Sequence, residues 1–183
     1  MKSLAKKLSF AALFAALCLV STLLVSVPLP NGYFNVGDVL VLLAAWCLGG
    51  VWGGVAAAIG SALADLWSGF ALYAPATFFV KGLDALAAFG VAWLVKKILP
   101  AQKLDVIARL LGAICGELVM VVGYFLFESM LYGFATAALS LAYNALQGAC
   151  CGGLAVAVFS ALYPIRSVRK LFPALYENEK NPD

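Results

Sequence analysis

The sequence contains no histidine, and charged residues make up only 11% of its 183 residues. Without histidine, the chain has neither a Ser–His catalytic pair nor an HExxH zinc motif. Asp65 and Asp84 lie in no recognisable protease motif. No GxxxxGK[ST] phosphate-binding loop occurs, so the chain does not hydrolyse ATP by that machinery. We therefore expect a protein that binds or transports a molecule, not an enzyme.

Cysteine is present but never forms a CxxC pair, so the sequence does not indicate a zinc site. The five cysteines fall inside apolar segments, as small buried hydrophobic residues do: Cys18, Cys47, Cys115, Cys150 and Cys151. The net charge of +3 is not gathered into a basic patch interleaved with aromatic residues, so nucleic acid is not an expected partner. We expect no metal and no cofactor.

Hydrophobic residues, by contrast, make up 64% of the chain. A soluble domain is about half apolar and could not bury this much apolar surface, whereas a bilayer accepts it. The apolar runs lie at 8–27, 36–48, 50–68, 77–98, 106–128 and 138–163. They predict an all-α polytopic membrane protein, a bundle of six transmembrane helices that forms one domain over residues 1–170. A short polar tail, 171–183, follows it.

Two of these runs admit a second interpretation. The first follows Lys2, Lys6 and Lys7 and is a possible signal peptide. It spans about 20 residues and no A-x-A cleavage site follows, which favours a membrane helix. The second, 36–48, would rise only about 20 Å as a helix. It is either a short or tilted span or half of a re-entrant hairpin with the third run.

The positive charges predict the orientation. They cluster before the first run, between the fourth and fifth, and after the last: Lys2, Lys6, Lys7; Lys96, Lys97, Lys103, Arg109; Arg166, Arg169, Lys170, Lys180. The other connections, 28–37, 69–76 and 129–137, contain no Lys or Arg. By the positive-inside rule, both termini and the turn around 96–109 are cytoplasmic.

Polar residues inside the spans gather towards the predicted outer side. They are Asp38, Asp65, Lys81, Asp84, Glu128, Asn144 and Gln147, with Glu117 alone near mid-membrane. Aromatic residues lie at the same level: Tyr33, Phe34, Trp67, Phe70, Tyr73, Tyr124, Tyr132 and Tyr143. A pocket for a small polar heterocycle needs a few polar groups of this kind among aromatic side chains.

Structural roles compete with this interpretation. Lys81 has two candidate salt-bridge partners, Asp84 three residues later and Asp65 on the preceding helix. Asp38 is a candidate N-cap for the second helix. An interfacial aromatic belt accounts for some of the aromatic residues. Glu128, Asn144 and Gln147 have no such simple explanation, and the last two share a helix face.

Small residues form close-packing faces on two of the predicted helices. In the third run they are Gly49, Gly53, Ala57 and Ser61, which indicates a central, tightly packed helix. In the first run they include Ala11, Ala12, Ala15 and Ala16. From the residues alone, the partner of this first-helix face is either within the chain or another protein.

Several motifs together resemble one transporter family. They are Gly32-Tyr33-Phe34-Asn35-Val36-Gly37-Asp38, Gly60-Ser61-Ala62-Leu63-Ala64-Asp65-Leu66, Tyr73-Ala74-Pro75-Ala76-Thr77 with Lys81-Gly82, Gly123-Tyr124 with Glu128, and Asn144-x-x-Gln147-Gly148. Over roughly residues 8–163 the chain resembles the substrate-specific S components of energy-coupling factor (ECF) vitamin transporters. The subgroup is the riboflavin type, which includes predicted carriers of pyridoxine, hydroxymethylpyrimidine and queuosine precursors.

The resemblance implies a six-helix subunit of the bacterial plasma membrane that binds a vitamin near the outer face. A transmembrane coupling subunit and two ATPase subunits would be its partners and supply the ATP hydrolysis. Together with the pattern of polar and aromatic residues, it leads us to expect the pocket residues Asn35, Glu128, Tyr132, Asn144 and Gln147, with Lys81 and Asp65 as second choices. An Ala-xxx-Ala pair on the first helix, Ala11/Ala15 or Ala12/Ala16, would contact the coupling subunit.

Two other functions remain open at this level. A stand-alone proton-coupled secondary transporter would use Glu117 or Glu128 as its proton site. A structural or assembly protein would use the small-residue faces only for packing.

Overall fold

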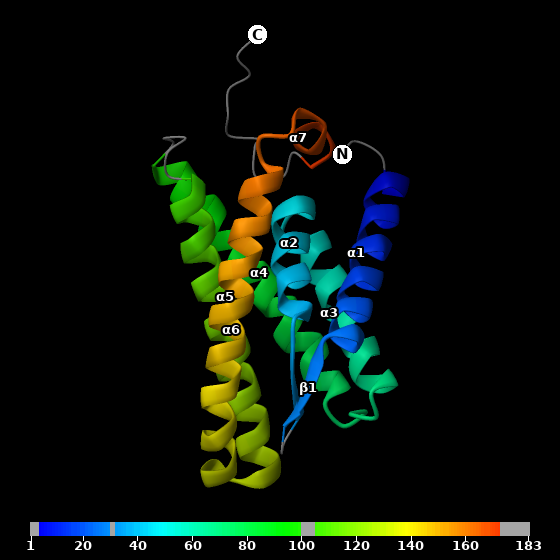
Figure 1. The fold of residues 1–183 in the computed structure, drawn as a ribbon, viewed down its shortest axis with the longest axis vertical. Coiled ribbons are helices and arrows are strands. Elements are labelled where there is room, and N and C mark those ends of the chain that lie inside the picture. The colour runs from blue at the N-terminus through cyan, green and yellow to red at the C-terminus, as the bar shows by residue number, and fades with distance from the viewer. Residues whose placement is uncertain (1–3, 30–31, 100–104, 173–183) are drawn as a thin grey trace.

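The computed structural model describes residues 4–29, 32–99 and 105–172, and within them the chain is almost entirely helical (Figure 1). The elements are α1 (Leu4–Leu24), β1 (Ser26–Leu29), β2 (Gly32–Asn35), α2 (Gly37–Leu48), α3 (Gly50–Trp67), α4 (Ala74–Ile98), α5 (Asp105–Tyr132), α6 (Phe134–Leu162) and α7 (Arg166–Leu171). Helices α1 to α6 coincide with the six predicted runs. Five of them, all except α2, are long and apolar enough to cross a membrane.

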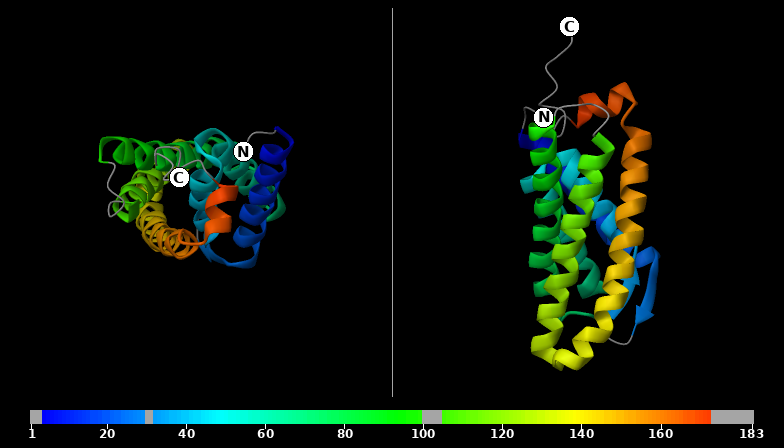
Figure 2. Two further views of the ribbon diagram at one scale, coloured as in Figure 1. Left: turned by 90° about the horizontal axis from the view of Figure 1, so that it is seen from above. Right: turned by 90° about the vertical axis from the view of Figure 1, so that its left-hand side faces the viewer.

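The short helix α2 forms the centre of the bundle. It packs against α1, α3, α4 and α6, and all its residues except Leu40 are buried. Helices α4, α5 and α6 stand side by side around it, and α1 and α3 close the other side (Figure 2). A 12-residue helix can be apolar on all faces when other helices cover it. This burial explains why the second run is apolar although it is too short to span in the usual way.

Close backbone contacts hold α3 against its neighbours. A Cβ atom on Gly53 would lie 2.6 Å from the carbonyl oxygen of Ala44 on α2, and one on Gly60 would lie 2.8 Å from Cβ of Cys18 on α1. Only glycine permits helices to approach this closely. Gly53, a member of the small-residue face predicted for the third helix, is therefore used inside this chain against α2, and Gly60, which was not predicted, is used against α1.

A β-hairpin between α1 and α2 was not predicted from the sequence. Strands β1 and β2 pair antiparallel, with Ser26 opposite Asn35 and Pro28 opposite Tyr33. The first helix, expected to extend to residue 27, ends at Leu24. Val25 and Val27 favour extended backbone, and Pro28 lacks the amide proton that a continuing helix needs. The hairpin folds back beneath α1 and α2 and carries its second strand directly into α2 (Figure 1).

The two ends of the described chain lie at the same end of the bundle, where α7 also lies (Figure 1). This end carries cations, including exposed Arg166, Arg169 and Lys170. Lys96 at the end of α4 forms a salt bridge of 3.0 Å with Asp105 at the start of α5. The predicted polar tail lies mostly outside the described residues, and α7 is an addition to the six predicted helices.

Candidate binding cavity

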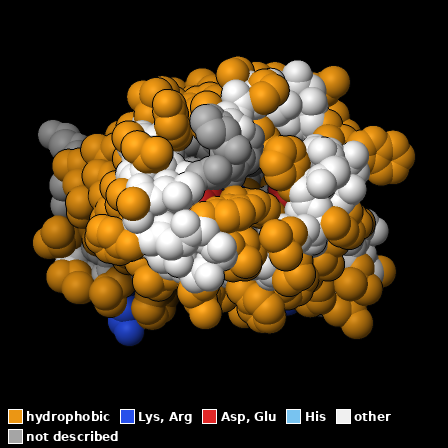
Figure 3. Space-filling view, turned by 90° about the horizontal axis from the view of Figure 1, so that it is seen from below, with side chains coloured by type: hydrophobic (Ala, Val, Ile, Leu, Met, Phe, Trp, Pro, Cys, Tyr) orange, Lys and Arg blue, Asp and Glu red, His pale blue; other side chains and the backbone are white. Residues whose placement is uncertain are grey.

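A cavity of about 480 Å³ opens at the end of the bundle opposite the termini. This volume lies within the range of ordinary small-molecule sites. Side chains from α1, both strands of the hairpin, α3, α4, α5, α6 and the turn before α4 line it: Thr22, Leu29, Tyr33, Asn35, Ser61, Asp65, Phe70, Tyr73, Thr77, Lys81, Tyr124, Glu128, Ala138, Leu139, Ser140, Ala142, Tyr143, Asn144 and Gln147. Figure 3 looks onto this end and shows acidic side chains inside a central hollow.

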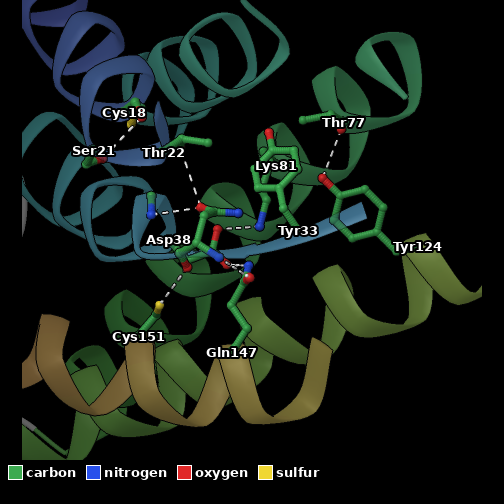
Figure 4. A network of polar contacts seen from close by, with 12 residues as sticks. Cys18, Ser21, Thr22, Tyr33, Asp38, Thr77, Lys81, Tyr124, Gln147 and Cys151 are labelled. Carbon is green, nitrogen blue, oxygen red and sulfur yellow. Dashed lines mark hydrogen bonds and ion pairs between the residues drawn. The ribbon is translucent and has the colours of Figure 1, made fainter. Parts of the chain in front are cut away.

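A buried ion pair lies at the floor of the cavity. The ammonium of Lys81 on α4 contacts Oδ1 of Asp38 on α2. Oδ2 of Asp38 accepts a hydrogen bond of 2.6 Å from Nε2 of Gln147 on α6 (Figure 4). The two sequence-based pairings of Lys81, with Asp84 or with Asp65, are therefore wrong. The N-cap role predicted for Asp38 is also wrong, because the N-cap residue of α2 is Val36 and no side chain caps it.

The end of the hairpin is anchored to the same network through Asn35. Its backbone N–H donates to Oε1 of Gln147 over 2.8 Å. Its side-chain Oδ1 accepts from the N–H of Gly37 over 2.8 Å and from the hydroxyl of Thr22 over 3.4 Å. Gln147 thus uses both ends of its amide, one on the hairpin and one on the ion pair. The buried polar groups are satisfied by one another, which specifies where α1, the hairpin, α2 and α6 meet.

Two carboxylates occupy the outer part of the cavity wall. Tyr33 on β2 donates a 2.5 Å hydrogen bond to Oδ1 of Asp65, and Tyr73, at the start of α4, donates a 3.4 Å bond to Oε1 of Glu128. Burial, and then the negative charge of Asp65, raises the pKa of Tyr33 well above its usual value. Its phenol therefore remains protonated at neutral pH and continues to donate.

Aromatic side chains form the rest of the outer wall. The rings of Tyr33 and Phe70 lie 5.1 Å apart, and those of Phe70 and Tyr73 lie 6.2 Å apart in an edge-to-face arrangement. The hydroxyls of Thr77 and Tyr124 share a 2.9 Å hydrogen bond. A flat ligand would meet aromatic faces here and polar groups at the cavity floor.

Six of the seven predicted pocket residues line this one cavity: Asn35, Asp65, Lys81, Glu128, Asn144 and Gln147. Tyr132 does not line it and is 44% exposed. It lies one helical turn beyond Glu128, at the last residue of α5. There it hydrogen-bonds Tyr73, and after burial this bond is the next cause of the raised pKa of Tyr73.

Sequence reasoning missed several hydroxyl-bearing residues of the lining: Thr22, Ser61, Thr77 and Ser140. Single Ser and Thr residues are common in membrane helices, where they usually bond their own backbone or a neighbouring helix. Ser61 and Thr77 carried a usable signal, because they lie within the quoted motifs Gly60–Leu66 and Tyr73–Thr77. Asp38 was assigned to capping because its true partners are 43 and 109 residues away in the sequence.

Two further carboxylates lie outside the lining. Asp84 on α4 and Glu117 on α5 are both buried. Among the residues that the structure describes, none of their four carboxyl oxygens has a hydrogen-bond partner. No group of three or more metal-binding side chains occurs in the described ranges. Carboxyls buried in this way inside a membrane are costly when charged.

The small-residue face of α1 divides into two parts. Ala11 is buried and Ala15 half-buried, on the side that packs against α3. Ala12 and Ala16 are exposed. The sequence left both pairs as candidates for a partner contact, and the packing leaves the Ala12/Ala16 pair as the accessible one.

Comparison with known proteins adds three findings. A family model described as ECF-type riboflavin transporter, S component, matches residues 2–164. An uncharacterized protein of Pyrococcus woesei, described by its position in the gap 3′ region, is 37% identical over 116 residues, which are 62% of this chain and 72% of that protein. The solved structure of the S component of a bacterial ECF transporter has a TM-score of 0.65 and 19% identity, covering 88% of this chain and 98% of that chain. At this identity the structural likeness establishes the fold.

Proposed function

We propose that this chain, which belongs to the family of ECF-type riboflavin transporter S components, captures a vitamin or a related heterocyclic precursor for import. The family is one of substrate-binding transporter subunits, and the chain is accordingly a multi-pass membrane protein. The observation that carries the proposal is the cavity of about 480 Å³, into which polar side chains from the hairpin and five helices converge. Most of the chain around it faces outward with apolar side chains.

The proposed partners are a transmembrane coupling subunit and two ATPase subunits. The sequence contains no phosphate-binding loop, so uptake against a gradient needs an external source of energy. Exposed Ala12 and Ala16 on α1 would let a helix of the coupling subunit approach closely. ATP hydrolysis would then occur only in the partner subunits.

The proposed location is the plasma membrane of a bacterial cell, with both termini in the cytoplasm. The cations gathered at the end of the bundle that holds the termini support this orientation. The cavity would then open to the outside. Reporter fusions at each terminus test this, because an active periplasmic reporter at either end contradicts it.

The direct test is binding by the purified full-length protein. Mass spectrometry of the compound that co-purifies identifies the ligand, and titration of that compound into the ligand-free protein gives the affinity. Absence of any co-purified compound, together with no binding across riboflavin, pyridoxine, hydroxymethylpyrimidine and queuosine precursors, would reject the proposal.

A stand-alone proton-coupled transporter is the second candidate. The buried carboxyl of Glu117, which has no hydrogen-bond partner in the described part of the chain, favours it. Uptake into proteoliposomes separates the two functions. Uptake by the reconstituted chain alone, driven by a pH gradient, supports the secondary transporter. Uptake that requires the coupling subunit, the ATPases and ATP supports the S component.

A further inference from the structure

The cavity is lined by more acidic than basic side chains, and the acidic and basic groups differ in how far protein partners already bond them. Three ionisable residues other than tyrosines line it: Lys81, Asp65 and Glu128. In the view onto the cavity, acidic side chains are visible inside the hollow, and the basic side chains that can be seen lie at the periphery (Figure 3). Whether Lys81 is paired with a protein carboxylate therefore determines which ligand charge the cavity favours.

Lys81 is already committed to a protein carboxylate. Its ammonium bonds Asp38, and the two side chains are 4% and 1% exposed. An ammonium has three N–H donors and the contact with Asp38 uses one, so Lys81 could still donate to a ligand, but Asp38 already neutralises its charge. An anionic ligand that drew Lys81 away from Asp38 would leave Asp38 a buried, partly unpaired charge, which is strongly unfavourable. The lysine is thus part of the structural floor and not a free anion-binding group.

The two cavity carboxylates, in contrast, are only partly satisfied. Thr77 also hydrogen-bonds Asp65 and Ser140 also hydrogen-bonds Glu128, but each carboxylate still has one oxygen without a bond among the described residues. Tyr33 bonds only Oδ1 of Asp65, and Tyr73 bonds only Oε1 of Glu128. Oδ2 of Asp65 and Oε2 of Glu128 are buried and have no hydrogen-bond partner within residues 4–29, 32–99 and 105–172. The two residues are 5% and 3% exposed. Buried acceptors without a donor are unfavourable, and a ligand that donates to both would remove that cost.

We infer that the cavity selects a ring compound that carries a protonated amine or other hydrogen-bond donors for Asp65 and Glu128, and that it excludes forms bearing a carboxylate or phosphate. This inference rests on the proposed function and narrows its substrate class. A protonated amine fits best, because charge-assisted hydrogen bonds to a carboxylate are about twice as strong as neutral ones. An added anion would face two carboxylates and one lysine whose charge Asp38 already neutralises.

The test compares ligands that share a ring and differ in charge. The probes are pyridoxamine against 4-pyridoxate, 7-aminomethyl- against 7-carboxy-7-deazaguanine, and riboflavin against its 5′-phosphate. The compound that co-purifies with the protein is a further probe, and it is compared with its own carboxylated or phosphorylated analogue. Affinities are measured by titration into the ligand-free, full-length protein in detergent. In the ring class that binds, we expect the cationic or neutral form to bind at least about tenfold more tightly than the anionic form.

If the affinity for the anionic form is within tenfold of the affinity for the cationic or neutral form of the same ring, or higher, the inference is wrong and the proposed function stands. No binding by any compound in any class overturns the proposed function and the inference with it. The two failures are therefore distinguishable in one experiment.

Isosteric variants locate the selection in the two carboxylates. Glu128→Gln and Asp65→Asn keep the side-chain shape and remove the charge. Each should lower the affinity for the cationic or neutral ligand and so reduce the affinity difference between that ligand and its anionic form. Asp105→Asn is the matched control, because Asp105 lies on the same helix as Glu128 but at its other end, outside the cavity lining. Gel filtration and thermal unfolding verify that each variant is folded. The inference is wrong if the cavity variants that fold discriminate between the two ligand forms as strongly as Asp105→Asn does.

Discussion

Lys81 on α4 and Asp38 on α2 are 43 residues apart and form a buried salt bridge at the floor of the cavity. Helix α2 contains no Lys or Arg, so the positive charge of the pair comes from α4, and the pair joins the two helices at this point. Gln147 bonds the second oxygen of Asp38 over 2.6 Å and brings α6 to the same point. One carboxylate therefore joins three helices.

Removing one member of this pair should be more harmful than removing both. Lys81→Met leaves Asp38 charged and partly unpaired, and we expect the free energy of unfolding to fall by about 3–5 kcal/mol. The double variant Asp38→Asn/Lys81→Met should recover a large part of that loss. Thermal unfolding in detergent, analysed as a double-mutant cycle, measures the coupling. Lys97→Met, which removes an exposed lysine of the same helix, is the control. A Lys81→Met variant as stable as Lys97→Met would contradict the assignment.

Asn144 and Gln147, three residues apart on α6, should respond differently to truncation. Gln147→Ala removes the bonds to Asp38 and to the Asn35 backbone, so both stability and ligand affinity should fall. Asn144 is half-buried in the cavity wall, so Asn144→Ala should lower the affinity and leave the unfolding temperature nearly unchanged. Hydrogen exchange of the hairpin should increase only in Gln147→Ala. Unchanged ligand affinity in Asn144→Ala would show that Asn144 does not contribute to the binding site.

Gly53 and Gly90 provide a matched test of helix packing. A Cβ atom on Gly53 would lie 2.6 Å from backbone atoms of Ala44 and Ala45, whereas one on Gly90 meets nothing within 4 Å. We expect Gly53→Ala to destabilise the protein by about 1–3 kcal/mol because α2 and α3 must separate. Gly90→Ala should be neutral or slightly stabilising, since alanine restricts the unfolded chain more than glycine does. Equal unfolding temperatures for the two variants would argue against close α2–α3 contact.

The two alanine pairs of α1 should have separable effects. Leucine at Ala12 or Ala16 projects from an exposed face, so the isolated protein should keep its stability and its ligand affinity. Co-purification with the coupling subunit should be lost, because the two helices no longer approach closely. Ala11→Leu, at a buried position, should instead lower the stability of the isolated protein. If Ala12→Leu and Ala16→Leu both retain the full complex, another face of the chain binds the coupling subunit.

The helical elements were largely predictable from the sequence because long apolar runs have few alternatives in a membrane. A spanning segment must satisfy its backbone internally, so the runs at 50–68 and 106–128 correspond closely to α3 and α5. The hairpin was not predictable, because a short segment between two helices shows no long period. Its structure depends on a hydrogen bond from Asn35 to Gln147, 112 residues later.

The cavity residues were predicted as a group more successfully than as pairs. Ionisable and amide residues are unfavourable in lipid, so Glu128, Asn144 and Gln147 had to face the bundle interior. Their level along the helices could be estimated from the rise per residue. The contacts among them could not be predicted from the sequence, because the rotation and tilt of each helix are set by packing with its neighbours.

The sequence by itself determined that this is a helical membrane protein with polar side chains gathered towards one end. In lipid, a spanning segment must satisfy its backbone hydrogen bonds within itself, and polar side chains must face the interior of the bundle. Only the tertiary structure decided that Lys81 pairs with Asp38 and that Ala12 and Ala16, not Ala11 and Ala15, are accessible. It also decided that Asp65 and Glu128, which line the cavity, each have one carboxyl oxygen without a hydrogen-bond partner among the described residues. Each of these depends on where separate helices meet, and that is set by close packing between residues far apart in the chain.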